Sequence, residues 1–359
     1  MKTRILISFC ATILFLVGLL SAGAALTGMT WSVQTVDDTG NVGRTTSLAL
    51  GTDGYAYISY WDHKNGEMKC AVFDGSRWST ETVDSTGGKG YIAFTSIALD
   101  ASGHPHISYD NGPAADLKYA VYNGSTWDVE TVDNTGDVGR YASLALDTRG
   151  RPHISYADYT TRDLKYATYD GTNWAITTVD SEGDVGYDTC IALDAVGRPH
   201  ISYTDWTNCT LKYATFDGSH WNKDTIDRTD GLGLQTAIAV DRDGRPHISY
   251  VVYTHGNLKY AAFDGSGWNT ETVDSADWVG YETSIVLDAD GHPGISYYAG
   301  DAGDLRYASF SGSAWRIETV DNAEGVGRYT SLVLDNDGLP HISYTSFSEG
   351  NLKYAVGTE

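Results

Sequence analysis

Two carboxylic acids, Asp188 and Glu282, interrupt a pattern that is otherwise repeated along the chain. They hold equivalent positions in two copies of the repeat, where two other copies carry tyrosine. Glycoside cleavage uses a pair of carboxyl groups, one as an acid and the other as a base or nucleophile. Drift among the copies accounts for two acids equally well, so a catalytic and a structural interpretation both stay open.

A second chemically suggestive set lies in a loop that varies from copy to copy. Its third residue after a repeated tyrosine is aromatic or histidine in five copies, and the preceding residue is aspartate in three. An aromatic ring beside a carboxylate suits a sugar, because C–H groups stack on the ring while hydroxyls donate to the acid. The alternative is that these rings pack loop against loop. The candidate ligand-binding residues are Asp62, His63, Asp158, Tyr159, Asp205, Trp206, Tyr253 and Phe347.

Both sets belong to a repeat that covers most of the 359 residues. Tryptophan recurs seven times between Trp31 and Trp315, at intervals of 47 residues apart from one of 49. Each unit contains short segments such as SLALD, HISY and LKYA, followed by a segment that begins with the tryptophan. Apolar and polar residues alternate in these segments, and Gly, Asp and Asn bound them, which predicts β-strands.

A four-stranded unit of this length is typical of one blade of a β-propeller. We therefore predict an all-β, seven-bladed propeller with four antiparallel strands per blade. The last unit stops after three strands, so the lone strand at 31–37 is expected to complete it and close the ring, leaving no free sheet edge. The predicted blades cover residues 44–84, 85–133, 134–180, 181–227, 228–274, 275–321 and 322–359 with 31–37.

The strand nearest the axis of a propeller lines a central channel. The start of the first strand is therefore the second place where a site could form, at the channel mouth. The residues assigned to this mouth are Arg44, Arg140, Arg328, Tyr141 and Tyr329, beside Asp188 and Glu282.

Residues that occur in every unit are expected to be scaffold. The repeated tryptophan and the HISY tyrosine are predicted to pack in the core, and the aspartate that ends each fourth strand to bond to a turn. The third-strand lysines are expected to pair with neighbouring acids. A histidine recurs in five units, but no unit adds further ligands at a metal-site spacing, so we predict no metal and no cofactor. Calcium binding stays open, although no motif indicates it.

The turn DGTNW at 170–174 resembles the Asp-box hairpins of sialidase-like propellers, where Asp, Gly and Trp mark the turn between the third and fourth strands. Here the spacing from Asp to Trp is one residue shorter. A sialidase-like site would combine an arginine cluster with a tyrosine and an acid, whereas the three mouth arginines fall in separate units. The near-identical units also resemble the fucose-binding propeller lectins, which implies repeated sugar sites. No lectin motif matches residue by residue, so the resemblance assigns no site.

The formal net charge of −23 argues against a nucleic-acid partner, because phosphate binding needs a basic face. Residues 1–24 have the layout of a secretory signal peptide, with Lys2 and Arg4 before an apolar run and small residues at its end. Cleavage would leave 25–359 as a single propeller domain, exported to the cell surface or the exterior, with no membrane span. Retention of the segment as an anchor is the alternative.

Three cysteines remain after such cleavage. Cys190 and Cys209 fall in the same unit, where an exported protein could form a disulfide, although the second strand lies between them. Cys70 replaces a repeated tyrosine and is predicted to be a buried free thiol.

Three functions fit these observations. The likeness of the units favours a non-catalytic, lectin-like module for a glycan or surface polysaccharide, with several equivalent sites. A glycoside hydrolase or lyase is the first alternative, and it predicts one asymmetric pocket at the channel mouth with perturbed carboxyl groups. A protein-interaction scaffold of the cell surface is the second, and it predicts an exposed apolar patch.

Overall fold

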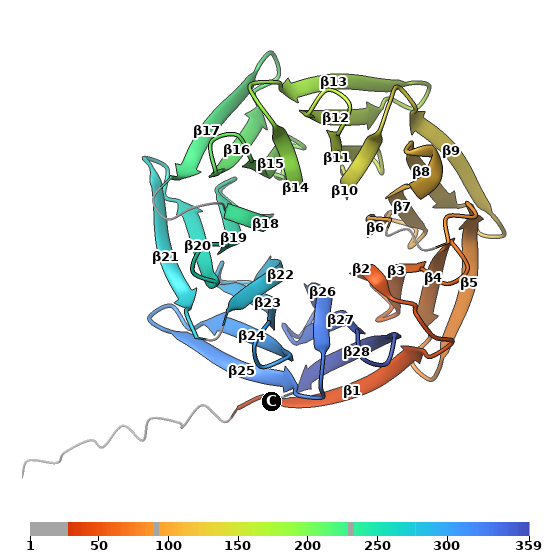
Figure 1. The fold of residues 1–359 in the computed structure, drawn as a ribbon, viewed down its shortest axis with the longest axis vertical. Coiled ribbons are helices and arrows are strands. Elements are labelled where there is room, and N and C mark those ends of the chain that lie inside the picture. Colours follow the sequence, from red (N-terminus) through yellow and green to blue (C-terminus); the bar gives the residue numbers. More distant parts are fainter. Residues whose placement is uncertain (1–27, 90–92, 229–232, 277, 359) are drawn as a thin grey trace, which may run out of the picture.

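The computed structural model describes residues 28–89, 93–228, 233–276 and 278–358, so the predicted signal peptide at 1–24 lies outside it. In the described residues the strands form seven antiparallel sheets of four strands each, set around one axis (Figure 1). The predicted seven-bladed propeller is confirmed. No helix in this part of the chain is long and apolar enough to cross a membrane.

The strands are numbered in chain order, and each blade takes four of them from the channel outward. Blade 1 contains β2 (Arg44–Leu50), β3 (Ala56–Asp62), β4 (Glu67–Phe73) and β5 (Trp78–Ser85). Blade 2 contains β6 (Thr95–Leu99), β7 (Pro105–Asp110), β8 (Leu117–Tyr122) and β9 (Trp127–Asp133). Blade 3 contains β10 (Val138–Leu146), β11 (Pro152–Asp158), β12 (Asp163–Tyr169) and β13 (Trp174–Asp180). Blade 4 contains β14 (Val185–Leu193), β15 (Pro199–Asp205), β16 (Thr210–Phe216) and β17 (Trp221–Asp227).

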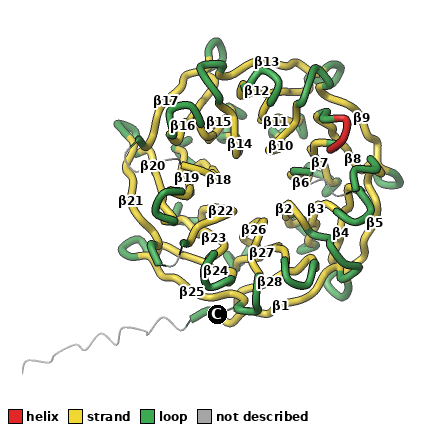
Figure 2. Tube along the Cα trace, viewed as in Figure 1, coloured by secondary structure: helices red, strands yellow, loops and turns green. Residues whose placement is uncertain are grey.

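The remaining blades repeat this order. Blade 5 contains β18 (Gly233–Val240), β19 (Pro246–Val252), β20 (Asn257–Phe263) and β21 (Trp268–Asp274). Blade 6 contains β22 (Val279–Leu287), β23 (Pro293–Ala299), β24 (Asp304–Phe310) and β25 (Trp315–Asp321). Blade 7 contains β26 (Val326–Leu334), β27 (Pro340–Ser346), β28 (Asn351–Thr358) and β1 (Thr30–Asp37). The short 3₁₀ helix η1 (Gly112–Ala114), between β7 and β8, was not predicted (Figure 2).

The ring is closed by the N-terminal strand, as predicted. β1 pairs with β28 in antiparallel register from Thr30 opposite Thr358 to Asp37 opposite Leu352. Blade 7 is therefore built from both ends of the described chain, which meet at the rim (Figure 1).

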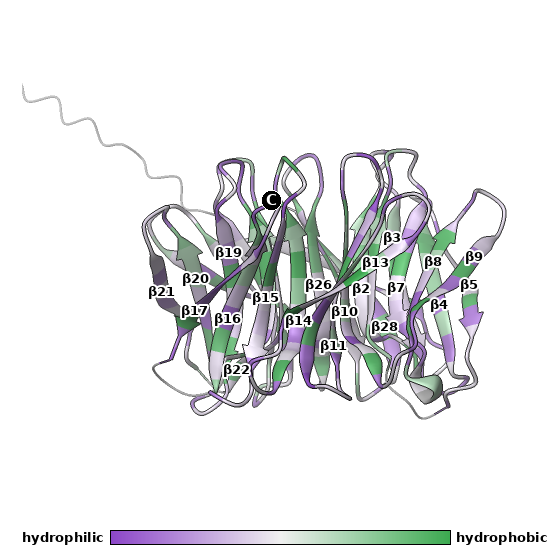
Figure 3. Ribbon diagram, turned by 90° about the horizontal axis from the view of Figure 1, so that it is seen from above, coloured by the Kyte–Doolittle hydropathy of each residue, from purple (hydrophilic) through white to green (hydrophobic). Residues whose placement is uncertain are grey.

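The blades stand along the axis, and their connecting loops gather on two opposite faces (Figure 3). Because strands alternate in direction, the loops after the second and fourth strands share the face where the first strands begin. We call this the mouth face. The loops after the first and third strands form the opposite face.

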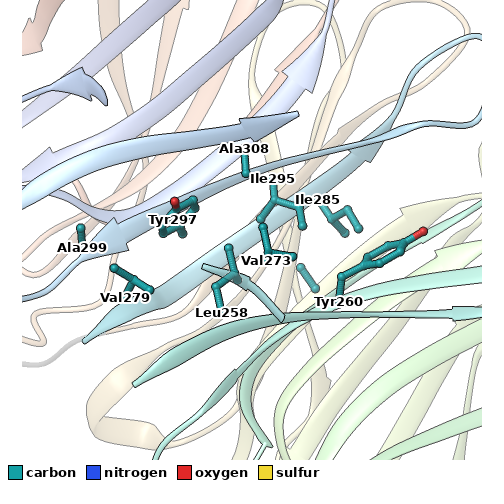
Figure 4. Packing of buried hydrophobic residues seen from close by; sticks show 10 residues of the cluster. Leu258, Tyr260, Val273, Val279, Ile285, Ile295, Tyr297, Ala299 and Ala308 are labelled. Atoms are coloured by element: carbon teal, nitrogen blue, oxygen red, sulfur yellow. The ribbon is translucent and has the colours of Figure 1, made fainter. Parts of the chain in front are cut away.

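Hydrophobic cores lie between adjacent blades. Between blades 5 and 6, Leu258 and Val279 are packed with the fully buried Tyr297 (Figure 4). At the outer edge, Trp268 packs edge-on against Tyr213 of the preceding blade, with ring centroids 5.1 Å apart. The predicted core role of the repeated tyrosine is confirmed, whereas the repeated tryptophan is only partly buried and packs against the edge of the core.

An inter-blade clasp joins each blade to the next: the aspartate that ends the fourth strand accepts a hydrogen bond from the buried HISY tyrosine of the following blade. In the first clasp the bond from Tyr60 to Asp37 is 2.6 Å long, and Lys69 lies 3.0 Å from the same carboxylate. Burial acts to raise the pKa of Asp37, but the hydrogen bonds from Tyr60 and Thr39 lower it to about 2. The other tyrosine–aspartate pairs are Tyr109–Asp84, Tyr156–Asp133, Tyr203–Asp180, Tyr250–Asp227, Tyr297–Asp274 and Tyr344–Asp321.

Glycine permits the close approach of neighbouring blades at the start of the first strand. Gly186 has φ +88° and Gly280 has φ +90°, and a Cβ on either would lie 2.9 Å from the Cα of a leucine in the preceding blade. Both the backbone conformation and the contact therefore require glycine.

A second inter-blade link joins the buried serine of each HISY segment to a threonine of the next blade. Thr189 donates a 2.9 Å hydrogen bond to Ser155, and Thr283 donates one of 2.9 Å to Ser249. Blade 3 has Ala142 in place of the threonine, and the buried Ser108 hydroxyl that would meet it has no hydrogen-bond partner among the described residues.

This difference predicts unequal effects for two otherwise identical substitutions. Ser155→Ala should lower the free energy of unfolding by about 1–3 kcal/mol, because the buried Thr189 hydroxyl loses its acceptor. Ser108→Ala should leave stability nearly unchanged, because its hydroxyl makes no hydrogen bond in the part of the chain that the structure describes. Urea unfolding followed by tryptophan fluorescence measures both, and equal losses would contradict the assignment.

Candidate functional site

The first strands of the seven blades surround a central cavity of about 390 Å³. Each blade contributes consecutive residues, for example 188–190 from β14 and 282–284 from β22. The second and third lining residues of each blade are mostly Ser and Thr, so most of the cavity wall is polar. The residues that vary from blade to blade are the first ones.

The first lining residue of each blade forms what we call the channel ring. In six blades this residue is not glycine and yet has a left-handed backbone, with φ of +49° to +55°. A side chain in that region costs roughly 1–2 kcal/mol. Such strain is typical of functional sites. The channel-ring residues are Thr45, Phe94, Tyr141, Asp188, Gln235, Glu282 and Tyr329, and all but Phe94 have this conformation.

A β-bulge produces the left-handed conformation. In β14 the register with β15 shifts between Tyr187 and Cys190, and in β22 the register with β23 shifts between Tyr281 and Ser284. The extra residue is displaced from the ladder, which is how bulges re-aim side chains next to binding sites. Asp188 and Glu282 are the displaced residues, and this is why both line the channel.

Hydrogen bonds connect the channel ring from blade 4 to blade 7. The Asp188 carboxylate accepts the backbone N–H of Gln235 at 3.1 Å, and the side-chain Oε1 of Gln235 accepts the backbone N–H of Glu282 at 2.9 Å. The Glu282 carboxylate then accepts the N–H of Tyr329 at 2.6 Å. The two acids are thus held in fixed positions, with one glutamine between them.

Burial raises the pKa of both acids. The pKa of Asp188 is about 6, since burial outweighs the hydrogen bond from Gln235. The pKa of Glu282 is about 7, because burial and the charge of Asp188 outweigh the Tyr329 N–H and the guanidinium of Arg328. A carboxyl group with a pKa near neutrality can give or take a proton under ordinary conditions.

An aromatic cluster covers the mouth over blades 2, 3 and 4. Tyr141 lies 4.3 Å from Phe94 and 6.1 Å from Tyr187, measured between ring centroids. Tyr187 also contacts Tyr159 at 5.1 Å and Trp206 at 5.7 Å. Tyr159 is therefore half-buried against its neighbours, whereas Trp206 is 49% exposed.

An arginine cluster occupies the mouth on the other side, where the ring closes. The guanidinium carbons of Arg44 and Arg328 each lie 5.3 Å from the centre of the Phe347 ring. Arg328 also lies 5.1 Å from the Tyr298 ring. Arg140 is elsewhere, over Tyr159 at 4.8 Å, so the structure brings together two of the three mouth arginines.

The loop residues divide into two groups. Trp206, Tyr253 and Phe347 lie on the mouth face with about half of each side chain exposed. His63 is half-buried in the corresponding loop of blade 1.

The three loop aspartates are buried, so their carboxylates are not exposed beside the aromatic rings as acceptors for a ligand. Asp62, Asp158 and Asp205 are buried, with 1–2% exposed. Each accepts backbone N–H groups of its own loop, as Asp205 does from Asn208 at 2.9 Å. These carboxylates hold the loops in shape, so the expected pairing of aromatic ring and free carboxylate is not present.

Sequence reasoning left several mouth residues out of the candidate site. Trp278 is 44% exposed and packs edge-on against Tyr253 at 6.4 Å. Trp278 lies in the loop after β21, directly before the first strand of blade 6. The equivalent residues before the first strands of blades 3 and 4 are Asp137 and Asp184. The replacement of this aspartate by an aromatic residue was the signal available in the sequence. Tyr298 follows a repeated tyrosine directly, and the packing of blade 7 against blade 6 brings Arg328 to its ring.

The three cysteines of the described chain are free thiols. Cys190 lines the channel near Ser143, and Cys209 is exposed in the loop after β15, so the suggested disulfide is not formed. The second strand separates them, one lying at the axis and the other on the outer surface of the loop. Cys70 is buried, as predicted.

The repeated histidines are held by the scaffold. The His200 ring bonds through Nδ1 to Tyr213 at 2.5 Å, and its Nε2 lies 3.7 Å from Asp194. Within the described ranges, no three side chains of His, Cys, Asp or Glu are placed to share a metal ion.

A larger hollow of about 630 Å³ lies on the opposite face, between the loops after β18 and β22. Its aspartates close turns, since Asp241 accepts the N–H groups of Asp243 and Arg245. The variable side chains gather at the mouth instead, which makes the mouth the better candidate.

No family model matches the chain, and no curated protein matches it. Several solved structures share its fold. A polysaccharide lyase, ulvan lyase, bound to -[GlcA(1-4)Rha3S]- aligns with a TM-score of 0.68 at 16% identity, over 90% of this chain and 96% of that one. A catalytically inactive virginiamycin B lyase from Staphylococcus aureus aligns with a TM-score of 0.64 at 12% identity, over 91% and 99% of the two chains.

A lectin from Aleuria aurantia in complex with Fucalpha1-6GlcNAc aligns with a TM-score of 0.53 at 15% identity, over 78% of this chain and 96% of the lectin. The resemblance to propeller lectins is thus confirmed at the level of architecture. At these identities the likeness shows the fold alone.

The environment of Glu282 predicts how its titration responds to two neighbours. Arg328→Ala should raise the Glu282 pKa above about 7, because it removes a positive charge that lowers it, and Asp188→Asn should lower it. Carbon NMR of side-chain-labelled glutamate, with Glu282→Gln to assign the signal, measures both shifts. A signal that titrates at the ordinary value of 4.5 would contradict the burial of Glu282.

The raised pKa of Glu282 also sets the direction in which its contribution to folding stability changes with pH. Because the folded protein binds the Glu282 proton more tightly than the unfolded chain, the stability it contributes is present below pH 4.5 and lost as the pH rises through about 7.

Proposed function

We propose that this protein is a non-catalytic carbohydrate-binding module whose ligand rests on the mouth face. The observation that supports this most is the gathering of exposed aromatic side chains on that one face. Trp206, Tyr253 and Phe347 follow the second strands of three blades, and Trp278 joins them from the loop before β22.

The chemistry of these side chains suits sugars. Aromatic rings that offer a flat surface stack on the C–H groups of a sugar ring, and neighbouring polar groups bond to its hydroxyls. Tyr187 offers a phenolic side chain beside Trp206, and Tyr141 lies next to Tyr187. A protein partner would call for a contiguous apolar patch, whereas here the exposed rings are interspersed with tyrosine and arginine.

The structural neighbours support the same class of ligand. A lectin and a polysaccharide lyase, both bound to saccharides, share the ring architecture. Residues 1–24 have the composition of a signal peptide, and export would bring the protein to glycans at the cell surface or outside the cell. The proposed binding needs no cofactor.

A glycan array probed with the purified protein tests this function. Wild-type protein should bind, and Trp206→Ala should weaken binding about tenfold, because stacking on an aromatic ring is lost. Tyr55→Ala is the matched control, since Tyr55 is an exposed aromatic on the opposite face. Absence of any binding, or equal loss in both variants, would overturn the proposal.

Glu282 supports a second candidate, cleavage of a glycan by hydrolysis or elimination at the channel mouth. Its pKa of about 7 fits an acid or base, and it lies in the channel ring beside Tyr329, whose pKa is raised by burial and by the Glu282 charge. The asymmetry is what an enzyme would need, because no other blade has glutamate at this position.

A turnover assay separates this candidate from binding alone. If the protein cleaves, it should release reducing ends from a bound polysaccharide, and Glu282→Gln should reduce the rate at least a hundredfold while leaving binding in place. Elimination also creates a conjugated alkene that absorbs ultraviolet light, whereas hydrolysis does not. Binding without any release of reducing ends would exclude the enzyme.

A further inference from the structure

Two arginines from different blades share one aromatic support at the mouth. Arg44 comes from blade 1 and Arg328 from blade 7, and both lie 5.3 Å from the ring centre of Phe347. The guanidinium carbon of Arg328 also lies 5.1 Å from the ring centre of Tyr298. The two guanidinium groups therefore lie near the same ring, and arginine makes such cation–π contacts more often than lysine.

Neither guanidinium has a carboxylate within ion-pair distance among the described residues. Other arginines of this acidic protein do: Arg140 lies 3.2 Å from Asp137, and Arg306 lies 3.1 Å from Asp274. Two like charges that lie against the same ring without a counter-ion repel one another. An anion brought by a ligand would remove that repulsion.

The nearest acid of the channel ring does not fill this role. The Glu282 carboxylate accepts the N–H of Tyr329, and burial raises its pKa to about 7, so much of its charge is suppressed near neutrality. The Arg328 charge acts on Glu282 and lowers its pKa, but no ion pair forms between the two groups within the described ranges, and Arg328 is only partly buried. Arg44 and Arg328 therefore form a small positively charged site in a protein whose net charge is −23.

We propose that Arg44 and Arg328 bind the carboxylate or sulfate group of an anionic polysaccharide. This inference rests on the carbohydrate binding proposed above and adds the class of sugar. The fork of a guanidinium matches both anions with paired hydrogen bonds. The exposed rings of Tyr253 and Trp278, which follow β19 and β21, offer stacking surfaces on the same face for other residues of the polymer.

Matched polymers test the charge and identify its source. Calorimetric titration would compare polygalacturonate with its methyl ester, and dextran sulfate with dextran, because each pair differs in the anionic group alone. We expect the charged member of at least one pair to bind at least tenfold more tightly. The pair that discriminates tells whether a carboxylate or a sulfate is recognised.

Variants then place the anion at the arginine cluster. Arg44→Gln and Arg328→Gln should each weaken binding of the charged polymer ten- to a hundredfold, the range expected for hydrogen bonds to a charged group. Arg77→Gln is the control with the same charge change, since Arg77 lies in an exposed turn on the opposite face. Arg328→Lys keeps the charge but not the fork, so an intermediate loss is expected, and thermal unfolding checks that each variant is folded.

The outcomes separate this inference from the function on which it rests. If glycans bind but no charged member is preferred, or if the arginine variants bind the charged polymer as wild type does, the anionic ligand is overturned and carbohydrate binding stands. If no glycan binds at all, the proposed function fails and this inference fails with it. Loss in the arginine variants with retention in Arg77→Gln supports it.

Discussion

The inter-blade clasp is the contact on which the ring depends. Asp180 ends blade 3, and its carboxylate meets the buried Tyr203 hydroxyl at 2.8 Å and the Lys212 ammonium at 2.5 Å, both from blade 4. Burying this charge is favourable only because both partners are in place. The same arrangement of aspartate and tyrosine recurs at every junction, so each blade is set against the next by the same geometry, and the closing strand brings Asp37 to the junction between the last blade and the first.

This regularity explains where variation can accumulate. The core and the clasp occupy the same residues in every blade, and a change there would disturb packing on two sides. The channel ring is different, because in six of the blades a bulge displaces one residue from the ladder at the start of the first strand. A residue that is displaced from the ladder can be Tyr141, Asp188 or Glu282 without a change in the strand pairing of the blade. The strain of its left-handed backbone is supported by the surrounding sheets.

The mouth consequently has two unlike halves within a sevenfold scaffold. Blades 2 to 4 present stacked aromatic rings around Tyr187, while the junction of blades 7 and 1 presents two arginines on Phe347. The two acids of the channel ring, whose pKa values are raised, come from blades 4 and 6. Such asymmetry is more than repeated equivalent sites would need, and it is compatible with one extended ligand lying across the mouth.

Sequence periodicity alone determined the number of blades, their four strands, the closing strand and the scaffold residues, because each follows from local alternation and turn chemistry repeated seven times. It also marked Asp188 and Glu282 as exceptions at the mouth. Only the tertiary structure decided that Asp205 and its equivalents face inward to hold their loops, and that Arg44 and Arg328 meet on one ring. Those contacts depend on loop conformation and on closure of the ring between opposite ends of the chain, which no local pattern encodes.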